Sequence, residues 1–204
     1  MQAFVAAALL CAVLLAVLLV ARSGGAPARP APATLRTTTL VLDLDETLVH
    51  TRFGEGGGAV ALVRPHAREF LTAAGAMFGE LVLFTAAARE YADDVVDQLD
   101  PGRTLISRRF YRDSCTPTPG GALAKDLRRV APERDVAEGR VLLLDNTPAS
   151  YALQPRCGVP IGSWFGEPAD RALPATLGVL AWVCTSSSPL DALEHARSVG
   201  WLPA

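Results

Sequence analysis

The sequence predicts an α/β domain with a central, mostly parallel β-sheet, and three observations support this fold class. Short apolar segments alternate with segments of helical composition, which is typical of parallel strands joined by helices. Three apolar segments, residues 38–44, 81–85 and 141–144, end in or next to polar residues. Open α/β sheets bind their ligands at the carboxyl ends of such strands. We therefore expect one domain with a site at that edge of the sheet.

The composition limits the classes of function. With 204 residues, half of them hydrophobic, the chain can bury one full core. The net charge is −2 and no basic block carries interleaved aromatic residues, so no nucleic-acid partner is expected. The four cysteines form no Cys-x-x-Cys pair. A disulfide framework or a zinc site is therefore not expected, and a reducing compartment is favoured.

The first 21 residues predict a transmembrane helix. Residues 3–21 form an unbroken apolar run, which as a helix would span about 28 Å, close to the thickness of a hydrocarbon core. A cleaved signal peptide is the alternative, but no Lys or Arg precedes the run, and the run is longer than a usual signal core. Arg22, Arg29 and Arg36 follow it, so the positive-inside rule places the body in the cytosol.

The predicted elements follow in a regular order after a Gly/Pro/Ala-rich linker at residues 22–36. The main domain is expected at 37–185, and its first strand, 38–44, carries two aspartates. Five residues that include four glycines, 54–58, separate the arms 49–53 and 60–63, which predicts a hairpin flap. Pro65 stops the second arm, and a helix at 68–76 leads to the strand 81–85.

The second half of the domain continues the alternation. Tyr91, Val95 and Leu99 recur at helical spacing within a helix at 86–99, so we expect all three in the core. The other expected elements are a strand at 105–111, a loop at 116–121, a helix opening at 125–130, strands at 141–144 and 159–161, and a helix at 170–183 interrupted near Pro174. Residues 186–204 form a last unit, in which Ser186 to Ser188 cap a helix at 190–199.

Asp43 and Asp45 are the strongest functional signal. Two residues apart in an extended segment, their side chains start on the same side, where two carboxylates repel unless a cation offsets them. Mg²⁺ suits this role because it takes oxygen ligands. The alternative is that the aspartates merely cap a strand and start a turn. Thr85, Lys125 and the pair Asp145-Asn146 strengthen the catalytic reading, although Lys125 by itself would be an ordinary lysine on a helix surface.

The chain resembles the Asp-x-Asp-x-Thr phosphatases of the haloacid dehalogenase superfamily, in particular the small phosphatases of the RNA polymerase C-terminal domain. The motifs are D-L-D-E-T-L-V-H at 43–50, R-P-H at 64–66, L-V-L-F-T-A at 81–86, K-D-L at 125–127 and L-L-D-N-T-P at 143–148. The segment V-P-I-G-S-W-F at 159–165 and the leading apolar helix make it most similar to the Dullard-like branch. The resemblance implies a Rossmann-like domain with a small β insertion and no large cap.

The resemblance also implies a role for each site residue. Asp43 would be the nucleophile that forms an aspartyl-phosphate, and Asp45 the general acid and base, although a hydrogen-bonding role within the loop is the alternative for Asp45. The phosphate would be held by Thr85, Lys125 and Arg112, of which Arg112 could equally be a surface arginine. Mg²⁺ would be bound by the side chains of Asp43 and Asn146 and the main-chain carbonyl of Asp45, with Asp145 supporting the metal, and Thr47 would stabilise the loop.

The resulting hypothesis is a membrane-anchored, Mg²⁺-dependent protein serine/threonine phosphatase. The resemblance implies phosphoprotein substrates such as lipin-type enzymes, a small membrane regulatory subunit, and location in the endoplasmic reticulum or nuclear envelope. Ala87 stands where the family often has serine, and the loop at 115–125 is about one residue longer, so substrate preference can differ. The alternatives are a non-catalytic receptor of the mitochondrial inner-membrane translocase with the same fold, which would need neither aspartate, and a small-molecule phosphatase.

Overall fold

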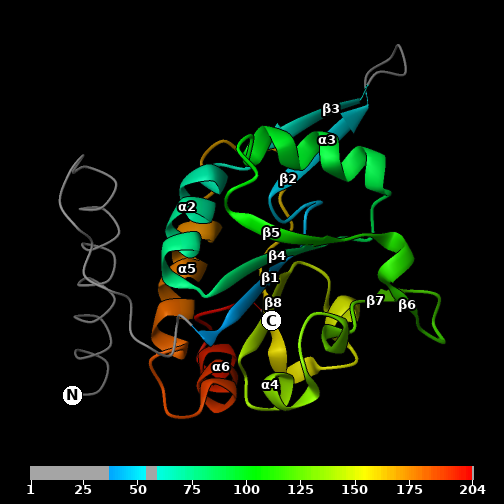
Figure 1. The fold of residues 1–204 in the computed structure, drawn as a ribbon. Helices are drawn as coiled ribbons and strands as arrows, with labels where there is room; N and C mark the ends of the chain where they lie inside the picture. Colours follow the sequence, from blue (N-terminus) through cyan, green and yellow to red (C-terminus); the bar gives the residue numbers. More distant parts are fainter. Residues whose placement is uncertain (1–36, 54–58, 204) are drawn as a thin grey trace.

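The computed structural model describes residues 37–53 and 59–203, and a five-stranded parallel sheet forms the centre of this part (Figure 1). The strands lie in the order β5-β4-β1-β8-β9, and every neighbouring pair is parallel. Their bounds are Thr39–Leu42 for β1, Glu80–Phe84 for β4, Ile106–Phe110 for β5, Val141–Asp145 for β8 and Gly158–Pro160 for β9. The predicted α/β fold with a central parallel sheet is therefore confirmed.

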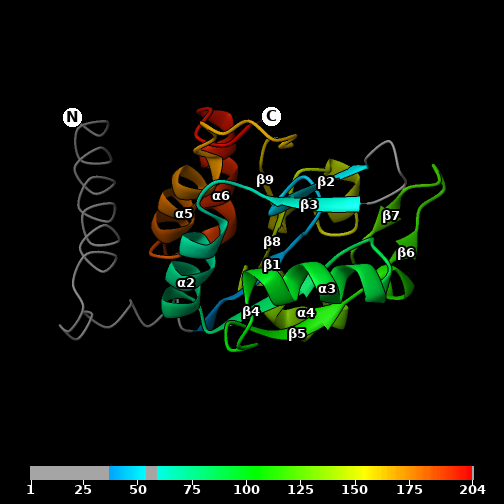
Figure 2. The same ribbon diagram turned by 90° about the horizontal axis from the view of Figure 1, so that it is seen from above.

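The core lies on both faces of this sheet. Leu40, Val41 and Leu42 of β1 are fully buried, as are Leu142 and Leu143 of β8, because strands covered on both faces need apolar side chains at successive positions. The described helices are α2 (Ala67–Met77), α3 (Arg89–Leu99), α4 (Glu133–Ala137), α5 (Ala172–Val183) and α6 (Pro189–Ser198). Figures 1 and 2 show α2, α5 and α6 side by side, and buried residues of all three belong to the same apolar core.

A hairpin follows the first strand, as the sequence predicts. Strands β2 (Val49–Phe53) and β3 (Ala59–Val63) pair in antiparallel fashion, with Thr51 opposite Ala61. The hydroxyls of Thr51 on β2 and Tyr91 on α3 are 2.6 Å apart, so the hairpin is attached to a helix of the main domain. We call the two strands β2 and β3 the flap.

Two local predictions around Lys125 need correction. Residues 118–121 are loop as expected, but Thr116–Pro117 form β6, which pairs with β7 (Leu123–Ala124) in a small antiparallel ladder. The helix predicted at 125–130 is only a 3₁₀ turn, η3, at Leu127–Arg129. The cause is backbone bonding: the N–H of Lys125 donates to the carbonyl of Ser150, and the turn begins only where the Asp126 side chain accepts the N–H of Arg128. Helix α4 was not predicted.

The last predicted helices need smaller corrections. Helix α5 begins at Ala172, so Pro174 lies in its first turn, where the missing N–H costs no intrahelical bond and the helix is not interrupted. Helix α6 begins at Pro189 after the capping residue Ser188, close to the prediction. The Ser188 hydroxyl, however, donates to the Asp191 carboxylate at 2.6 Å and does not bond the backbone of the first turn.

The predicted transmembrane helix at residues 1–21 and the linker at 22–36 lie outside the described residues. Within residues 37–53 and 59–203, no helix combines the length and the hydropathy that crossing a bilayer requires.

Asp100 closes the turn between α3 and β5. Its carboxylate, which is 2% exposed, accepts the backbone N–H groups of Thr104 at 3.1 Å and of Leu105 and Ile106 at 3.0 Å. Burial alone would raise the pKa of Asp100, but these three donors outweigh burial and hold it below 3.8. The turn that leads the chain into the edge strand β5 therefore depends on one carboxylate.

We expect Asp100→Asn to lower the free energy of unfolding by about 1–3 kcal/mol in urea titrations, because the amide keeps only one acceptor oxygen and no charge. Asp94→Asn is the matched control, since the Asp94 side chain is exposed on the same helix. A folded-state pKa below 3.8 means that the carboxylate stabilises the fold above that pH and loses this effect as the pH falls through the folded value. The difference between wild type and Asp100→Asn should therefore shrink in acid, and a constant difference would contradict this role.

Candidate active site

The candidate site lies at the carboxyl ends of the three central strands. Asp43 follows β1 directly, Asp145 is the last residue of β8, and Thr85 follows β4. In the sheet register Leu42 of β1 is opposite both Leu83 of β4 and Leu144 of β8. The three polar residues therefore reach the same edge of the sheet, which is the arrangement that the apolar segments of the sequence predict.

A buried lysine joins two of these carboxylates. The Nζ of Lys125 donates to Oδ1 of Asp43 at 2.5 Å and to Oδ2 of Asp145 at 2.6 Å. Lys125 is 1% exposed, Asp43 7% and Asp145 1%. Burying an ion is costly unless an opposite charge is in contact with it, and here one ammonium serves two carboxylates. The three groups together carry a net negative charge when all are ionised.

The pKa shifts in this group follow from its charges. Burial alone would lower the pKa of Lys125, but the carboxylates of Asp43 and Asp145 outweigh it and raise the pKa, so the ammonium stays protonated. Burial and the charge of Asp43 together raise the pKa of Asp145 to about 6, although the bonds from Lys125 and from the N–H of Thr147 oppose this rise. The site therefore favours any additional positive charge near Asp43.

Without the K-D-L motif, the sequence would predict Lys125 on the surface of a helix. In the structure Lys125 is buried and lies outside any helix. Lys125 directly follows β7, and its N–H donates to Ser150 at 2.7 Å, which fixes the backbone beside the 3₁₀ turn Pro148–Tyr151. From this extended position the side chain reaches between β1 and β8. The small β6–β7 ladder is thus the element that delivers the cation.

Asp45 is held by a tyrosine. Its Oδ1 accepts the hydroxyl of Tyr91 at 2.5 Å, and the same hydroxyl lies 2.6 Å from Oγ1 of Thr51. Burial raises the pKa of Asp45, the bond from Tyr91 opposes this, and the nearby charge of Asp43 adds to it. Burial and the contact with Asp45 also raise the pKa of Tyr91, so its hydroxyl stays protonated and donates.

Oxygen atoms of Asp43 and Asn146 meet at Thr47. The Thr47 hydroxyl donates to Oδ2 of Asp43 at 2.8 Å and lies 3.2 Å from Oδ1 of Asn146, while Nδ2 of Asn146 donates to Ser163. A hydroxyl has a single proton and cannot serve both acceptors fully, so the two oxygens have spare acceptor capacity. Carboxylate and amide oxygens of this kind are ligands that Mg²⁺ accepts.

No group of three or more His, Cys, Asp or Glu side chains able to hold a metal occurs in the described residues. The predicted ligand set uses an amide and a main-chain carbonyl beside Asp43, and both oxygens of Asp145 are already engaged, by Lys125 and by the N–H of Thr147 at 2.8 Å. Both oxygens of Asp43 are bonded too, by Lys125 and by Thr47. The donor chemistry of Asp43, Asn146 and Asp145 fits Mg²⁺, and the assignment of ligands among them stays a prediction.

The two other predicted phosphate-binding residues lie on the loop after β4 and beside it. Thr85 is buried, and its Oγ1 accepts the N–H of Ala87 at 3.0 Å. Arg112 is exposed, and its Nε donates to the carbonyl of Ala86 at 2.6 Å, so its guanidinium is bound to the same loop. Burial raises the pKa of Cys115, and the charges of Lys125, Asp43 and Arg112 all act on that thiol. The guanidinium of Arg112 is therefore attached to the loop that carries Thr85.

Arg64 is a site residue for which the sequence suggested no role. It is 1% exposed and bonds both oxygens of Asp170 at 2.9 Å. The same guanidinium donates to the carbonyls of Glu46 at 3.3 Å, Thr47 at 3.1 Å and Gly162 at 2.9 Å. Glu46 has a left-handed backbone with φ of 57°, so the loop after Asp45 takes a conformation that needs external support. Arg64 supplies that support.

Tyr91 and Thr51 were also missed as site residues. Val95 and Leu99 are buried as predicted, but Tyr91 is only half-buried and its hydroxyl faces Asp45. The position of Tyr91 in the sequence could have indicated a role in the site. The first turn of a helix that follows a sheet strand lies next to the carboxyl ends of the strands. Helical spacing alone could not separate this role from core packing.

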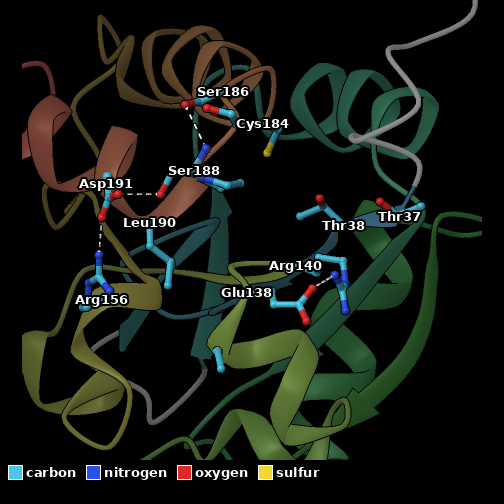
Figure 3. A pocket seen from close by; sticks show the side chains of 13 residues that line it. Thr37, Thr38, Glu138, Arg140, Arg156, Cys184, Ser186, Ser188, Leu190 and Asp191 are labelled. Atoms are coloured by element: carbon cyan, nitrogen blue, oxygen red, sulfur yellow. Dashed lines mark hydrogen bonds and ion pairs between the residues drawn. The ribbon is translucent and has the colours of Figure 1, made fainter.

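A cavity of about 560 Å³ lies away from these residues (Figure 3). It is lined by Thr37 and Thr38, which precede β1, and by residues near the start of α6, whereas Asp43 follows the other end of β1. Its charges are matched within the cavity, since Arg156 bonds Asp191 at 2.5 Å and Arg140 bonds Glu138. It is therefore distinct from the candidate site.

Comparison with known proteins gives one matching family. Residues 38–188 match the model of the NLI interacting factor-like phosphatases. Human carboxy-terminal domain RNA polymerase II polypeptide A small phosphatase 1 is 44% identical over 149 residues, which cover 66% of this chain and 54% of that protein. The Drosophila melanogaster CTD nuclear envelope phosphatase 1 homolog is 35% identical over 165 residues, which cover 70% and 65%. The chain thus spans about half to two thirds of the length of these relatives.

The solved structure of fission yeast RNA polymerase II CTD phosphatase Fcp1 bound to beryllium fluoride supports the fold. It superposes with a TM-score of 0.50 at 19% sequence identity, over 80% of this chain and 53% of that one. At this identity the similarity concerns the architecture alone.

We expect Lys125→Met to cost about 3–5 kcal/mol of unfolding free energy, because Asp43 and Asp145 would be left buried without a countercharge. Adding Asp145→Asn to Lys125→Met should recover part of this loss, since it removes one of the two uncompensated charges. Urea unfolding of both variants measures the effect. A double variant that is no more stable than Lys125→Met would contradict the electrostatic explanation.

Arg64→Lys should lower the unfolding free energy by about 2–4 kcal/mol, because one ammonium cannot bond Asp170 and three carbonyls together. Amide hydrogen exchange of residues 44–48 should become faster in this variant. Arg68→Lys is the matched control: Arg68 is exposed four residues later, with one bond to the carbonyl of Gln98, and we expect a change below about 0.5 kcal/mol. Equal effects of the two substitutions would show that Arg64 does not support the loop.

Proposed function

This chain belongs to the family of NLI interacting factor-like phosphatases, and on that premise we propose that it is a protein phosphatase that hydrolyses phosphoserine and phosphothreonine through an aspartyl-phosphate at Asp43. The observation that carries this proposal is the Lys125 ammonium in contact with Asp43 and Asp145 inside the domain. A cation in that position offsets the negative charge of a phosphate ester that approaches Asp43. A purely structural ion pair would need only one carboxylate.

In the first step an oxygen of Asp43 attacks phosphorus, an Asp43–phosphorus bond forms, and the bond from phosphorus to the ester oxygen breaks. Asp45 gives a proton to that oxygen, so the serine or threonine leaves as an alcohol. The Thr47 hydroxyl and Lys125 each bond one oxygen of Asp43, which fixes the orientation of the carboxylate before attack.

In the second step Asp45, now a carboxylate, removes a proton from a water molecule as its oxygen bonds to phosphorus. The bond to Asp43 breaks and inorganic phosphate leaves. Thr85, Lys125 and Arg112 are proposed to hold the phosphoryl oxygens, which carry most of the negative charge of the transition state. In support of this, Thr85 lies on the loop after β4, where its Oγ1 accepts the N–H of Ala87, and Arg112 contacts the same loop through the carbonyl of Ala86.

Mg²⁺ is the proposed cofactor. Asp43, Asn146 and the carbonyl of Asp45 would hold it, with Asp145 orienting Lys125. When bound, the ion supplies positive charge that offsets the charge of the phosphoryl oxygens. The spare acceptor capacity of Asp43 and Asn146 next to Thr47 supports this ligand set.

A protein segment is the proposed substrate. Between β5 and β8 the chain has only the β6–β7 ladder, two 3₁₀ turns and the five-residue α4, so this insertion is too small for a cap domain. The names of the relatives point to phosphoprotein substrates and to the nuclear envelope. We also propose anchoring by residues 1–21 in the endoplasmic reticulum or nuclear envelope membrane with the domain in the cytosol, lipin-type substrates, and a small membrane regulatory subunit. The comparisons do not support a non-catalytic translocase receptor.

We expect the full-length protein in detergent to release phosphate from a phosphoserine peptide only when Mg²⁺ is present, and to stop when EDTA removes the ion. Asp43→Asn should lose at least about 1,000-fold in kcat, because the amide cannot accept phosphorus. Asp94→Asn, which changes an exposed aspartate outside the site, should keep wild-type activity.

Phosphate release, circular dichroism and a panel of sugar phosphates together separate the possible outcomes. A folded protein that turns over neither peptide nor sugar phosphate would contradict the proposal and favour a binding protein. Preferred turnover of sugar phosphates would favour a small-molecule phosphatase.

A further inference from the structure

We propose that Tyr91 is a positioning residue that determines which oxygen of Asp45 exchanges the proton with the substrate. This inference rests on the proposed function, since it concerns the general acid and base of that reaction. It begins from a three-residue chain of hydrogen bonds that crosses from the flap to the site: Thr51 on β2, Tyr91 on α3 and Asp45 after β1.

The direction of these hydrogen bonds follows from their chemistry. The hydroxyl of Tyr91 donates a hydrogen bond to Oδ1 of Asp45 at 2.5 Å. Because this hydroxyl has only one proton, its oxygen can only accept from a second partner. Thr51, 2.6 Å away, is then the donor to Tyr91. The flap hydroxyl thereby fixes the tyrosine, and the tyrosine fixes one oxygen of the carboxyl group.

The consequence concerns the other oxygen of Asp45. An oxygen that already accepts a short hydrogen bond is the poorer place for a proton, so the acidic proton of Asp45 belongs on Oδ2. The described residues give Oδ2 no hydrogen bond, and none of their buried side-chain oxygens lacks a partner, so this oxygen is open to substrate and water. Oδ2 therefore gives its proton to the ester oxygen in the first step and takes one from water in the second, while Oδ1 keeps its bond to Tyr91.

The sequence position of Tyr91 suits this role. It is the third residue of α3, a helix that begins four residues after Thr85 at the carboxyl edge of the sheet. Its ring is half-buried and its hydroxyl has both partners described above. A merely structural explanation is that the hydroxyl is bonded because it is partly buried. If Tyr91 positions Asp45, removing its hydroxyl should slow only substrates whose leaving group needs a proton. If the hydroxyl has a merely structural role, its removal should affect all substrates alike.

The decisive experiment compares leaving groups in full-length Tyr91→Phe. A serine alkoxide needs a proton to leave, whereas p-nitrophenolate leaves with little help, and kcat/KM reports the steps up to leaving-group departure. We expect kcat/KM for a phosphoserine peptide to fall by roughly 10- to 100-fold, and kcat/KM for p-nitrophenyl phosphate to fall by less than about threefold. Equal losses for both substrates, or no loss for the peptide, would overturn the inference.

Tyr111→Phe is the matched control. The Tyr111 hydroxyl donates to Asp93 at 2.8 Å, so this variant also loses a tyrosine–aspartate hydrogen bond, but one that does not involve Asp45. We expect the two kcat/KM values of Tyr111→Phe to keep their wild-type ratio. A ratio changed as strongly as in Tyr91→Phe would mean that any loosening of α3 produces the effect, and would overturn the inference.

Thr51→Val provides a second test that leaves the tyrosine in place. Loss of the flap hydroxyl should lower kcat/KM for the peptide by roughly three- to tenfold and leave p-nitrophenyl phosphate unchanged, because Tyr91 is then less firmly held. An unchanged peptide value would contradict the role of the flap. If the wild-type protein hydrolyses neither substrate, the proposed function itself fails. If the wild type hydrolyses both and Tyr91→Phe lowers kcat/KM equally for both, only the inference about Tyr91 fails.

Discussion

The contact of one buried ammonium with two buried carboxylates is the constraint on which the rest of the site depends. Parallel strands bring Asp43 and Asp145 to the same edge of the sheet, where they would repel each other at low solvent exposure. Lys125 makes this arrangement stable by bonding both. Asp43 nevertheless stays 7% exposed. The same ion contacts therefore stabilise the fold and prepare the site for its chemistry. A further cation would neutralise the remaining negative charge of the three groups.

Hydrogen bonds from two side chains, Arg64 and Tyr91, hold the loops that surround this group. Arg64 joins the loop after Asp45 to Asp170 and to Gly162, and Tyr91 joins Asp45 to the flap. Among the described residues no buried side-chain nitrogen or oxygen lacks a hydrogen-bond partner. Such complete bonding makes a polar site rigid, since each group that moves would lose a partner in a medium of low dielectric. Rigid placement is what acid–base and nucleophilic chemistry require.

Much of the architecture could be predicted because it depends on local patterns. The apolar segments predicted β1, β4 and β8 and therefore the edge where Asp43, Thr85 and Asp145 meet. The cases that failed depend on distant partners. Lys125 avoids a helix because its N–H bonds Ser150, and Tyr91 serves Asp45 although its spacing matches the core pattern. The burial of Arg64 follows from Asp170, more than a hundred residues later, which no local pattern could indicate.

The most direct measurement of the central claim is a crystal structure of the protein with Mg²⁺ and beryllium fluoride, which imitates a phosphoryl group on a carboxylate. If Lys125 and a divalent ion make Asp43 an acceptor for phosphorus, beryllium will be bonded to an oxygen of Asp43, with Nζ of Lys125 close to a fluoride and Mg²⁺ between Asp43 and Asn146. An unmodified Asp43, with Lys125 still bonded to Asp43 and Asp145 and no ion beside Asn146, would contradict the account.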